Sequence, residues 1–490
     1  GAFSGCSSLN GTLTLSESLT TISGNAFYNC SGLIGAIDIP DGVTSINNSA
    51  FYGCSGFDGP IIIGKSVGNI YGSAFNGCSS VSAIITKRAT PPSVSNVNAF
   101  NGMNNMIPIY VPNGTTETYR VAENWDYFSN YNNQIITSSE TPSETIPTAI
   151  DVLCVNNNYT LTSNTSAYYT YFANETNVLT IGNGGVLTVT EDLATTSASQ
   201  LVIEDGGQLV LPNGAKVNAT VKKSIAEPSK SVDGWYTIAS PVNNMAIAGS
   251  SLVLESPAVY DLYRYDEPSV YWRNYEAHDD FTHLTNGSGY LYYNSTGADL
   301  SFVGELNSNN IVFPLSYTEG NGIYAGWNLI GNPFSHTIYK GTGAAIDNAN
   351  LAQGYYLLNN HSGWQAKLGY FDPIAVGQGI LVQAIASANL TITNSTAAAS
   401  GEKVSRDYVE VTVSDGQYED VAYVVFDTGV GLSKIDHFNE NIPMLYIPQD
   451  GKDYAIALVG SDVKQVPLNL NAVSTGQYSM KVKTNGSIEI

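Results

Sequence analysis

Four short segments recur at a fixed interval at the start of the chain. AFSGC, AFYNC, AFYGC and AFNGC place Phe3, Phe27, Phe51 and Phe75 24 residues apart, and a cysteine follows each phenylalanine at the same distance. A five-residue pattern that returns at one period predicts a solenoid, in which each repeat packs only on its neighbours. Such a stack presents a long continuous surface, which favours binding over catalysis.

Apolar residues between these segments indicate which side chains form the core of the solenoid. The recurring core positions are Leu9, Leu33, Phe57 and Val81; Leu13, Ile37, Ile61 and Ile85; and Ile22, Ile46 and Ile70. Because alternate residues of a strand face opposite sides, the residues between them should project from the outer face of a parallel sheet. We expect this face to bind a protein partner through Thr12, Thr14, Ala36, Asp38, Ile62 and Thr86.

The cysteines share one position of the repeat. Cys6, Cys30, Cys54 and Cys78 follow Ala and Phe in successive repeats, so stacking predicts a ladder of buried thiols. Five cysteines are too few for a disulfide scaffold in a chain of 490 residues. We expect the ladder to be reduced, and we expect Cys154 to be structural.

The composition excludes some classes of partner. A net charge of −23 disfavours nucleic acid, because a phosphate backbone would be repelled. Abundant Tyr and Gly with few charged residues are typical of an extracellular β protein. No apolar run reaches the roughly 18 residues of a membrane-spanning helix. The chain begins at Gly1 inside a repeat and ends at Ile490 in a predicted strand, so we expect a longer precursor that carries the export signals.

The pattern AFxxCxxLxxxxxIPxxVxxIxxxAF in residues 1–137 resembles the bacterial surface leucine-rich repeat of the BspA-like family. The resemblance includes a terminal cap at 106–135, a strand followed by a short amphipathic helix. It implies that the cap closes the core with Tyr119, Val121, Ala122, Trp125 and Phe128. Proteins of this family are surface adhesins or host-contact proteins, so the resemblance implies a binding protein at the cell surface.

Residues 138–150 lack apolar periodicity and read as a linker. A second repeat follows in 151–228, where LTIGNGGVLTV at 179–189 returns 22 residues later as LVIEDGGQLVL. The turns Asn183-Gly184 and Asp205-Gly206 indicate either hairpins or β-arcs. We therefore expect a small β-solenoid or meander that serves as a stalk, and the whole chain should be mainly β.

Residues 229–398 contain a duplication. GWYTIASPV returns as GWNLIGNPF, so that Trp235 and Trp327 lie 92 residues apart, and two further segments return in the same order. The duplicated unit is predicted to be mostly β and about 90 residues long. Either each copy is a small sandwich, or the two copies are the halves of one.

At least six alternating strands in 399–490 predict a C-terminal β-sandwich, which we expect to be truncated. With the preceding DGWYTIASP unit, the segment SKIDHFNENIPMLYIPQDGKDYAIAL resembles the module before the sorting signal in secreted proteins of Gram-negative anaerobes. This resemblance implies export through the outer membrane, followed by display on the cell surface or release.

Motifs for catalysis are sparse. The chain has no HExxH motif, and its closest histidines are His278 and His283 in EAHDDFTHL. The Gly-rich turns open no helix that could hold phosphate, and they lack the clustered carboxylates of a calcium site. We therefore predict a non-catalytic protein without cofactor or metal.

Aromatic residues in VYDLYRYDEPSVYWRNYEAHDDF offer a second kind of binding site. Flat aromatic faces beside polar groups suit a sugar platform, and we list Tyr271, Trp272, Tyr275 and Trp364 as glycan contacts. The alternative is that these rings pack in the core of the duplicated unit. The predicted function is an adhesin-like, monomeric binding protein that recognises proteins through its leucine-rich-repeat face. The alternative function is glycan binding by the duplicated unit.

Overall fold

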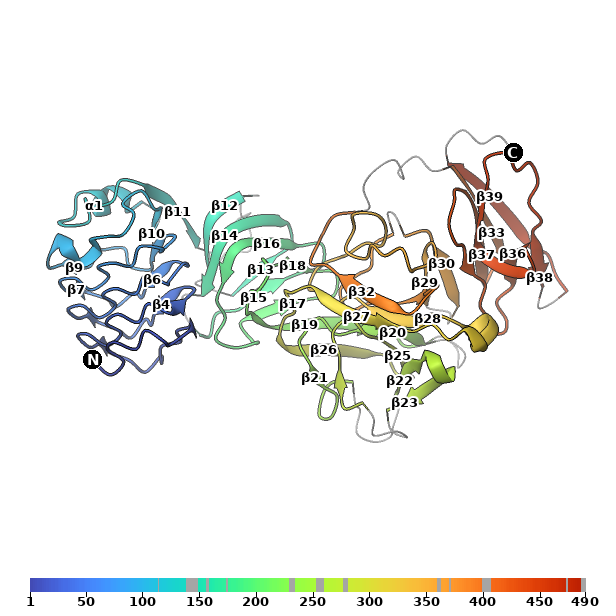
Figure 1. Ribbon diagram of the computed structural model, residues 1–490, viewed down its shortest axis with the longest axis horizontal. Coiled ribbons are helices and arrows are strands. Elements are labelled where there is room, and N and C mark those ends of the chain that lie inside the picture. The colour runs from blue at the N-terminus through green and yellow to red at the C-terminus, as the bar shows by residue number, and fades with distance from the viewer. Residues whose placement is uncertain are drawn as a thin grey trace. The chain divides into compact units, whose positions relative to one another are not determined.

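The computed structural model is mainly β (Figure 1). The residues that it describes are 1–112, 114–137, 149–155, 158–172, 175–228, 234–252, 260–275, 281–358, 363–369, 372–398, 407–472 and 475–485. They form two compact units, one of residues 1–157 with 167–174 and one of residues 158–166 with 175–490. Among the described residues, no helix has both the length and the apolar character needed to cross a membrane.

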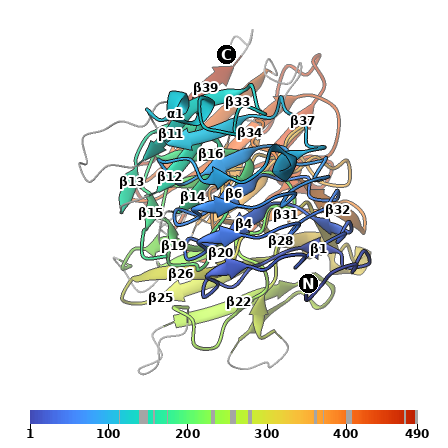
Figure 2. The same ribbon diagram turned by 90° about the vertical axis from the view of Figure 1, so that its left-hand side faces the viewer.

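Parallel strands stack along the repeats of the first unit. Figure 2 looks onto them, and β4 and β6 lie side by side there. The main sheet runs in the order β4 (Ile37–Ile39), β6 (Ile61–Ile63), β8 (Ile84–Thr86), β10 (Ile109–Pro112), β11 (Tyr131–Thr137), β12 (Ala149–Val155) and β14 (Asn164–Phe172). A second, narrower sheet joins β2 (Thr21–Ile22), β5 (Ser45–Ile46), β7 (Asn69–Ile70) and β9 (Ser93–Val94). The repeat therefore forms a solenoid, as the sequence predicts.

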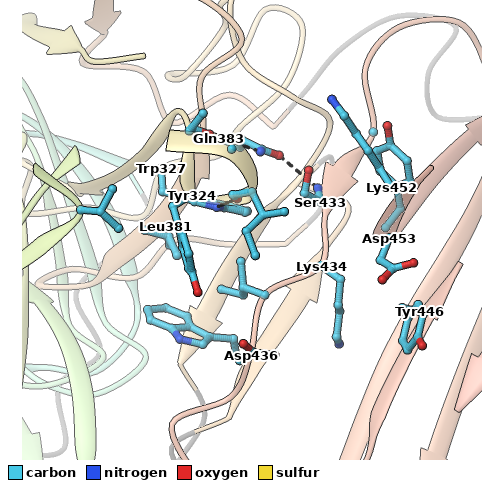
Figure 3. A pocket seen from close by; sticks show the side chains of 18 of the residues that line it. Tyr324, Trp327, Leu381, Gln383, Ser433, Lys434, Asp436, Tyr446, Lys452 and Asp453 are labelled. Atoms are coloured by element: carbon cyan, nitrogen blue, oxygen red, sulfur yellow. Dashed lines mark hydrogen bonds between the residues drawn. The ribbon is translucent and has the colours of Figure 1, made fainter. Parts of the chain in front are cut away.

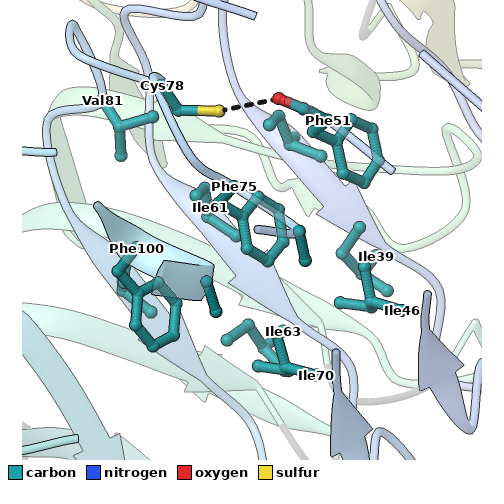
Figure 4. Packing of buried hydrophobic residues seen from close by; sticks show 14 of the residues in the cluster. Ile39, Ile46, Phe51, Ile61, Ile63, Ile70, Phe75, Cys78, Val81 and Phe100 are labelled. Carbon is teal, nitrogen blue, oxygen red and sulfur yellow. Dashed lines mark hydrogen bonds between the residues drawn. The ribbon is translucent and has the colours of Figure 1, made fainter. Parts of the chain in front are cut away.

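The repeated phenylalanines form a stacked column in the core between these two sheets (Figure 4). The ring centroids of Phe27 and Phe51 are 5.3 Å apart, and those of Phe51 and Phe75 are 5.4 Å apart. Three of the repeat cysteines secure the same corner in the same way; the thiol of Cys78, for example, donates a hydrogen bond to the carbonyl oxygen of Phe51 at 3.3 Å. All five cysteines are free thiols, and four of them are buried. The predicted reduced ladder is therefore present, although Cys6 is exposed.

A single helical turn covers the core at the end of the repeats. Helix α1 (Thr116–Arg120) and the residues after it bury Tyr119, Trp125 and Phe128 against the last repeat, as predicted for a cap. Val121 is an exception, since its side chain is 78% exposed. The cap does not end the sheet, because β11 pairs in parallel with β10 and with β12.

The second unit begins with short parallel strands. One sheet has the order β13 (Tyr159–Leu161), β15 (Leu179–Ile181), β17 (Leu201–Ile203), β19 (Asn218–Ile225) and β26 (Ala298–Glu305), while β16 (Val186–Leu193) pairs with β18 (Gln208–Val210). The strands on either side of each Gly-Gly turn do not pair with each other but with their equivalents in the next repeat. These turns are therefore β-arcs of a solenoid rather than hairpins.

The two copies of the duplication build sheets with the same strand order. Copy 1 contains β20 (Trp235–Ala239), β25 (Gly289–Asn294), β22 (Tyr260–Asp266) and β23 (Tyr271–Asn274); copy 2 contains β28 (Trp327–Gly331), β31 (Gly379–Gln383), β29 (Tyr355–Leu358) and β30 (Trp364–Lys367). The copies meet at glycines, because a Cβ atom on Gly331 would lie 2.3 Å from the Cβ atom of Ala239. Their sheets therefore pack directly on each other, and Leu291 of copy 1 shares a hydrophobic cluster with Leu381 of copy 2.

The C-terminal strands form one sheet whose central strands are buried on both faces. Its order is β38 (Asn469–Asn471), β36 (Met444–Gln449), β37 (Lys452–Val459), β34 (Glu419–Phe426), β33 (Tyr408–Ser414) and β39 (Ser479–Asn485), with β35 (Leu432–Ser433) also paired to β37. Alternation along β34 places Val421 and Tyr423 against copy 2 and places Ala422 and Val424 in a separate core. The face of this sheet that carries Val421 and Tyr423 therefore lies beside the duplicated unit.

The predicted domain boundaries at 137, 229 and 399 stay predictions. Most of the predicted linker at 138–150 lies outside the described residues, and so do 229–233 and 399–406.

Candidate functional site

The predicted protein-binding face of the leucine-rich repeats is only partly open. Thr12 and Thr14 are exposed, and Ala36 and Asp38 are half-buried. Two of the predicted contacts are wrong, because Ile62 is 3% exposed and Thr86 is fully buried. The two residues are buried for different reasons.

Thr86 faces the core because the register shifts by one residue in its repeat. Ile61 pairs with Ile84, one position earlier than a strict 24-residue period would place its partner, so Thr86 aligns with the inward-facing Ile63. The hydroxyl of Thr86 lies 2.8 Å from that of Tyr119, which itself donates to the carbonyl oxygen of Arg88. Thr86 therefore donates to Tyr119 and satisfies a buried hydroxyl of the cap.

Ile62 does project from the outer face, but the first unit covers that face itself. A separate hydrophobic cluster joins Ile62, Ala83, Ile85 and Tyr110 of the repeats to Val152, Cys154, Tyr169 and Tyr171 of β12 and β14. The rings of Tyr110 and Tyr169 meet edge to face with centroids 5.9 Å apart. The outer face is therefore closed from the repeat of β6 onward, and its free part lies over the earlier repeats.

Charged groups border the closed part of this face. Lys87 Nζ lies 3.8 Å from Asp38 Oδ1 and 3.7 Å from Asp41 Oδ1, and it sits over the ring of Tyr171. The Oδ1 atom of Asp38 is buried without a hydrogen-bond partner among the described residues, although the side chain as a whole is 45% exposed. This burial raises the pKa of Asp38, and the ammonium group of Lys87 partly opposes that shift.

The predicted glycan contacts separate into two groups. Trp272 and Trp364 come from different copies and line one cavity of ≈ 980 Å³ in the second unit. Tyr271 is 51% exposed and does not line this cavity, and Tyr275 packs on Phe281. The structure therefore brings together one aromatic residue from each copy and leaves the two tyrosines outside.

The cavity is lined by copy 1, copy 2 and the C-terminal sheet (Figure 3). Its aromatic lining residues are Tyr265, Trp272, Tyr317, Tyr324, Trp327, Trp364, Phe438, Tyr446 and Tyr454. Its polar lining residues are Gln383, Ser433, Lys434, Asp436, His437, Lys452, Asp453 and Asn471. Gln383 Oε1 accepts a hydrogen bond from the backbone N–H of Ser433 at 3.0 Å, which ties copy 2 to the C-terminal sheet across the cavity.

Phe438 brings the aromatic residues of the two copies together. Its ring centroid lies 6.1 Å from Trp235 and 6.0 Å from Trp272 of copy 1, and 5.5 Å from Trp364 of copy 2. Phe438 belongs to the loop between β35 and β36, so the C-terminal sheet supplies the ring that joins the copies. The sequence analysis missed Phe438, since a single phenylalanine in a polar loop carries no periodic signal.

Three buried ionisable groups hold this loop in place. Asp420 Oδ2 contacts Lys434 Nζ, accepts a hydrogen bond from the backbone N–H of Leu445 at 2.7 Å, and lies 3.5 Å from His437 Nε2. His437 Nδ1 accepts a hydrogen bond from the backbone N–H of Trp364 at 3.0 Å, so a neutral His437 carries its proton on Nε2, facing Asp420. Burial alone would raise the pKa of Asp420, but the charge of Lys434, the adjacent His437 and the hydrogen bond from Leu445 lower it.

These groups form a structural charge cluster at the cavity wall, of which Lys434 and His437 are lining residues. Asp420, Lys434 and His437 have side chains that are at most 3% exposed, and Asp420 lies beneath the lining residues. No group of three or more His, Cys, Asp or Glu side chains suited to a metal ion occurs among the described residues. Of the two histidines that lie closest in the sequence, His278 is outside the described residues.

The fold of the first unit defines its class: a leucine-rich-repeat solenoid with stacked Phe and Cys corners and a helical cap. Residues 1–106 and 31–144 match the model of the BspA type Leucine rich repeat region, which describes six copies of the repeat. Residues 1–144 are therefore BspA-type leucine-rich repeats. Neither a curated protein nor a solved structure matches the chain significantly.

Proposed function

We propose that this chain is a non-catalytic, adhesin-like binding protein of a bacterial cell surface that contacts a protein partner through its leucine-rich repeats. The match of residues 1–144 to BspA-type repeats carries this proposal, because proteins with such repeats are commonly surface adhesins. The resemblance of the later modules to secreted proteins of Gram-negative anaerobes supports export through the outer membrane.

The contact surface is the open part of the repeat sheet. Thr12, Thr14, Ala36 and Asp38 lie on the repeats that β12 and β14 leave uncovered. Small side chains with a single carboxylate leave room for an approaching protein surface, and they form a patch with little charge to desolvate. The burial of Ile62 limits this surface to the first two repeats.

Glycan binding by the duplicated unit is the second candidate function. One observation favours it, since Trp272 and Trp364 come from different copies and still line the same cavity. The two kinds of partner can be told apart, because trypsin destroys a protein partner and periodate destroys a glycan partner.

Binding of the labelled full-length chain to cultured epithelial cells would separate the two candidates. Cells treated with trypsin should lose most of their binding if the partner is a protein, whereas cells treated with periodate should retain it. Loss after periodate with retention after trypsin would contradict the protein-binding proposal and favour the glycan.

A further inference from the structure

We propose that the aromatic cavity of the second unit binds a neutral or N-acetylated oligosaccharide, an inference that rests on the second candidate function. The site is not confined to the duplicated unit. The C-terminal sheet contributes Phe438, Asp436, Tyr446 and Asp453 to its lining. The cavity is therefore complete only where the two copies and the C-terminal sheet meet.

The size of the cavity suits a ligand of several sugar rings. At ≈ 980 Å³ it lies near the upper end of the range of about 300–1,000 Å³ that is usual for small-molecule sites. Sites of this kind combine apolar and aromatic walls with a few polar groups that orient the ligand. If this region were only a packed core, its own side chains would fill the space.

Some of the aromatic residues expose their rings to the cavity, while others support them. Tyr324 is 49% exposed, Phe438 is 39% exposed and Trp272 is half-buried, so these three rings are accessible to a ligand. Trp327 and Trp364 are almost fully buried, and the ring of Trp364 packs on that of Phe438. The faces of a sugar ring that carry C–H groups are apolar, and they pack well on flat aromatic rings.

Polar groups at the cavity are available for sugar hydroxyls. The carboxylates of Asp436 and Asp453 accept no hydrogen bond from any described residue, and both belong to exposed residues. Carboxylates accept hydrogen bonds from hydroxyl groups, and such charge-assisted bonds are stronger than neutral ones. The hydroxyl of Tyr446 and the ammonium of Lys452 extend the same rim (Figure 3).

Charge selects among the classes of glycan. Lys434 is neutralised by Asp420 and is almost fully buried. Asp436 and Asp453 line the cavity together with Lys452, whose ammonium forms no ion pair with a described residue. The whole chain carries a net charge of −23, which repels sulfated and sialylated sugars. A neutral sugar avoids this repulsion, and the methyl group of an N-acetyl substituent can pack on apolar lining residues such as Ile323 and Leu381.

The rim of the cavity also contains an unfavourable backbone conformation. Val270 has φ 51° and ψ 50°, in the left-handed region that a β-branched side chain rarely adopts. Such residues persist where the surrounding structure holds them, and they cluster at ligand sites. Val270 leads directly into β23, which carries Trp272.

Tryptophan fluorescence of the full-length chain gives a direct readout, because three tryptophans line the cavity. The probes are chitotetraose, which is N-acetylated, cellotetraose, which is neutral, and a heparin tetrasaccharide, which is anionic. Chitotetraose or cellotetraose should change the fluorescence with a saturable dependence on concentration, and the heparin fragment should not. Absence of a response to both uncharged probes, or a response to the heparin fragment alone, would overturn the proposal.

Two substitutions locate the binding. Tyr324→Ala and Asp436→Ala remove exposed groups of the lining, and each should weaken binding of the responding probe by about tenfold or more. Tyr271→Ala is the matched control, since Tyr271 is an exposed tyrosine next to Trp272 that does not line the cavity. Its affinity for the probe should equal that of the unmodified chain. Equal weakening by all three substitutions, or by none of them, would place the binding elsewhere.

Measuring both probe binding and cell binding of the same chain distinguishes oligosaccharide binding in the cavity from adhesion by the repeats. If Tyr324→Ala abolishes probe binding and leaves trypsin-sensitive cell binding unchanged, both the cavity and the repeat surface are functional. If no probe binds while trypsin-sensitive cell binding persists, only the oligosaccharide inference is overturned.

Discussion

The rings of Phe438 and Trp364 lie with their centroids 5.5 Å apart and their planes inclined by 47°. This contact joins a loop of the C-terminal sheet to copy 2 of the duplication. Phe438→Ala should lower the free energy of unfolding by about 1–2 kcal/mol, because a partly exposed ring loses aromatic contacts but leaves little enclosed space. Urea unfolding followed by tryptophan fluorescence measures the change.

Phe438→Leu is the control for this substitution, since leucine keeps most of the apolar contact and loses the aromatic one. We expect it to cost less than Phe438→Ala. Equal stability of both variants and the unmodified chain would show that the loop does not hold the two modules together.

The charge cluster at Asp420 predicts a dependence of stability on pH. The pKa of Asp420 is lower in the folded chain, so its stabilisation is present above the unfolded value of about 3.9 and is lost as the pH falls through the folded value. Asp420→Asn leaves Lys434 buried without its carboxylate and should cost about 3–5 kcal/mol at pH 7. Thermal melting between pH 3 and pH 7 should show a flatter acid limb for this variant.

Lys434→Met is the complement of Asp420→Asn, because it removes the cation and leaves the carboxylate of Asp420 buried. It should destabilise the chain by a similar amount at pH 7. If Asp420→Asn has the same melting temperature as the unmodified chain at neutral pH, the cluster does not stabilise the loop.

The cysteine ladder predicts selective reactivity of the thiols. Burial raises the pKa of Cys54 to about 12 and also raises the pKa of Cys78, whereas Cys6 is exposed. The thiolate is the reactive form, so iodoacetamide at pH 8 should modify Cys6 in the native chain and spare the buried thiols. Peptide mass spectrometry measures the sites. Modification of Cys54 at the rate of Cys6 would contradict the stacked arrangement.

Ile62 tests whether the outer face of the repeats is closed. Ile62→Asp would bury a carboxylate among Tyr169, Tyr110 and Ile85, and we expect a loss of more than about 3 kcal/mol. Ile34→Asp is the control, because Ile34 is 48% exposed and its replacement should change stability by less than about 0.5 kcal/mol. Similar stabilities of the two variants in urea unfolding would show that β12 and β14 do not cover the face.

Much of the fold could be predicted from the sequence because its repeats carry redundant information. The 24-residue interval predicts the inward-facing phenylalanines and the thiol ladder, and the match between Trp235 and Trp327 predicts a duplicated unit that is mostly β. Local patterns of this kind depend only on neighbours along the chain or in the next repeat.

Features that depend on distant contacts were not predictable in the same way. One residue fewer between Ile61 and Ile84 turns Thr86 inward, and a strict period cannot reveal that shift. The covering of Ile62 by Tyr169 joins segments more than 100 residues apart. The aromatic cavity likewise needs Phe438, which no repeat or motif marks, whereas Trp272 and Trp364 were visible as aromatic residues beside polar ones.

Saturation binding of the labelled full-length chain to epithelial cells, measured by flow cytometry, tests the proposed adhesin function most directly. Ala36→Arg places a large charged side chain on the open repeat face and should reduce binding by about tenfold, while Thr20→Arg, at an exposed position outside the predicted contacts, should leave it unchanged. An unchanged affinity for Ala36→Arg would contradict binding through the leucine-rich repeats.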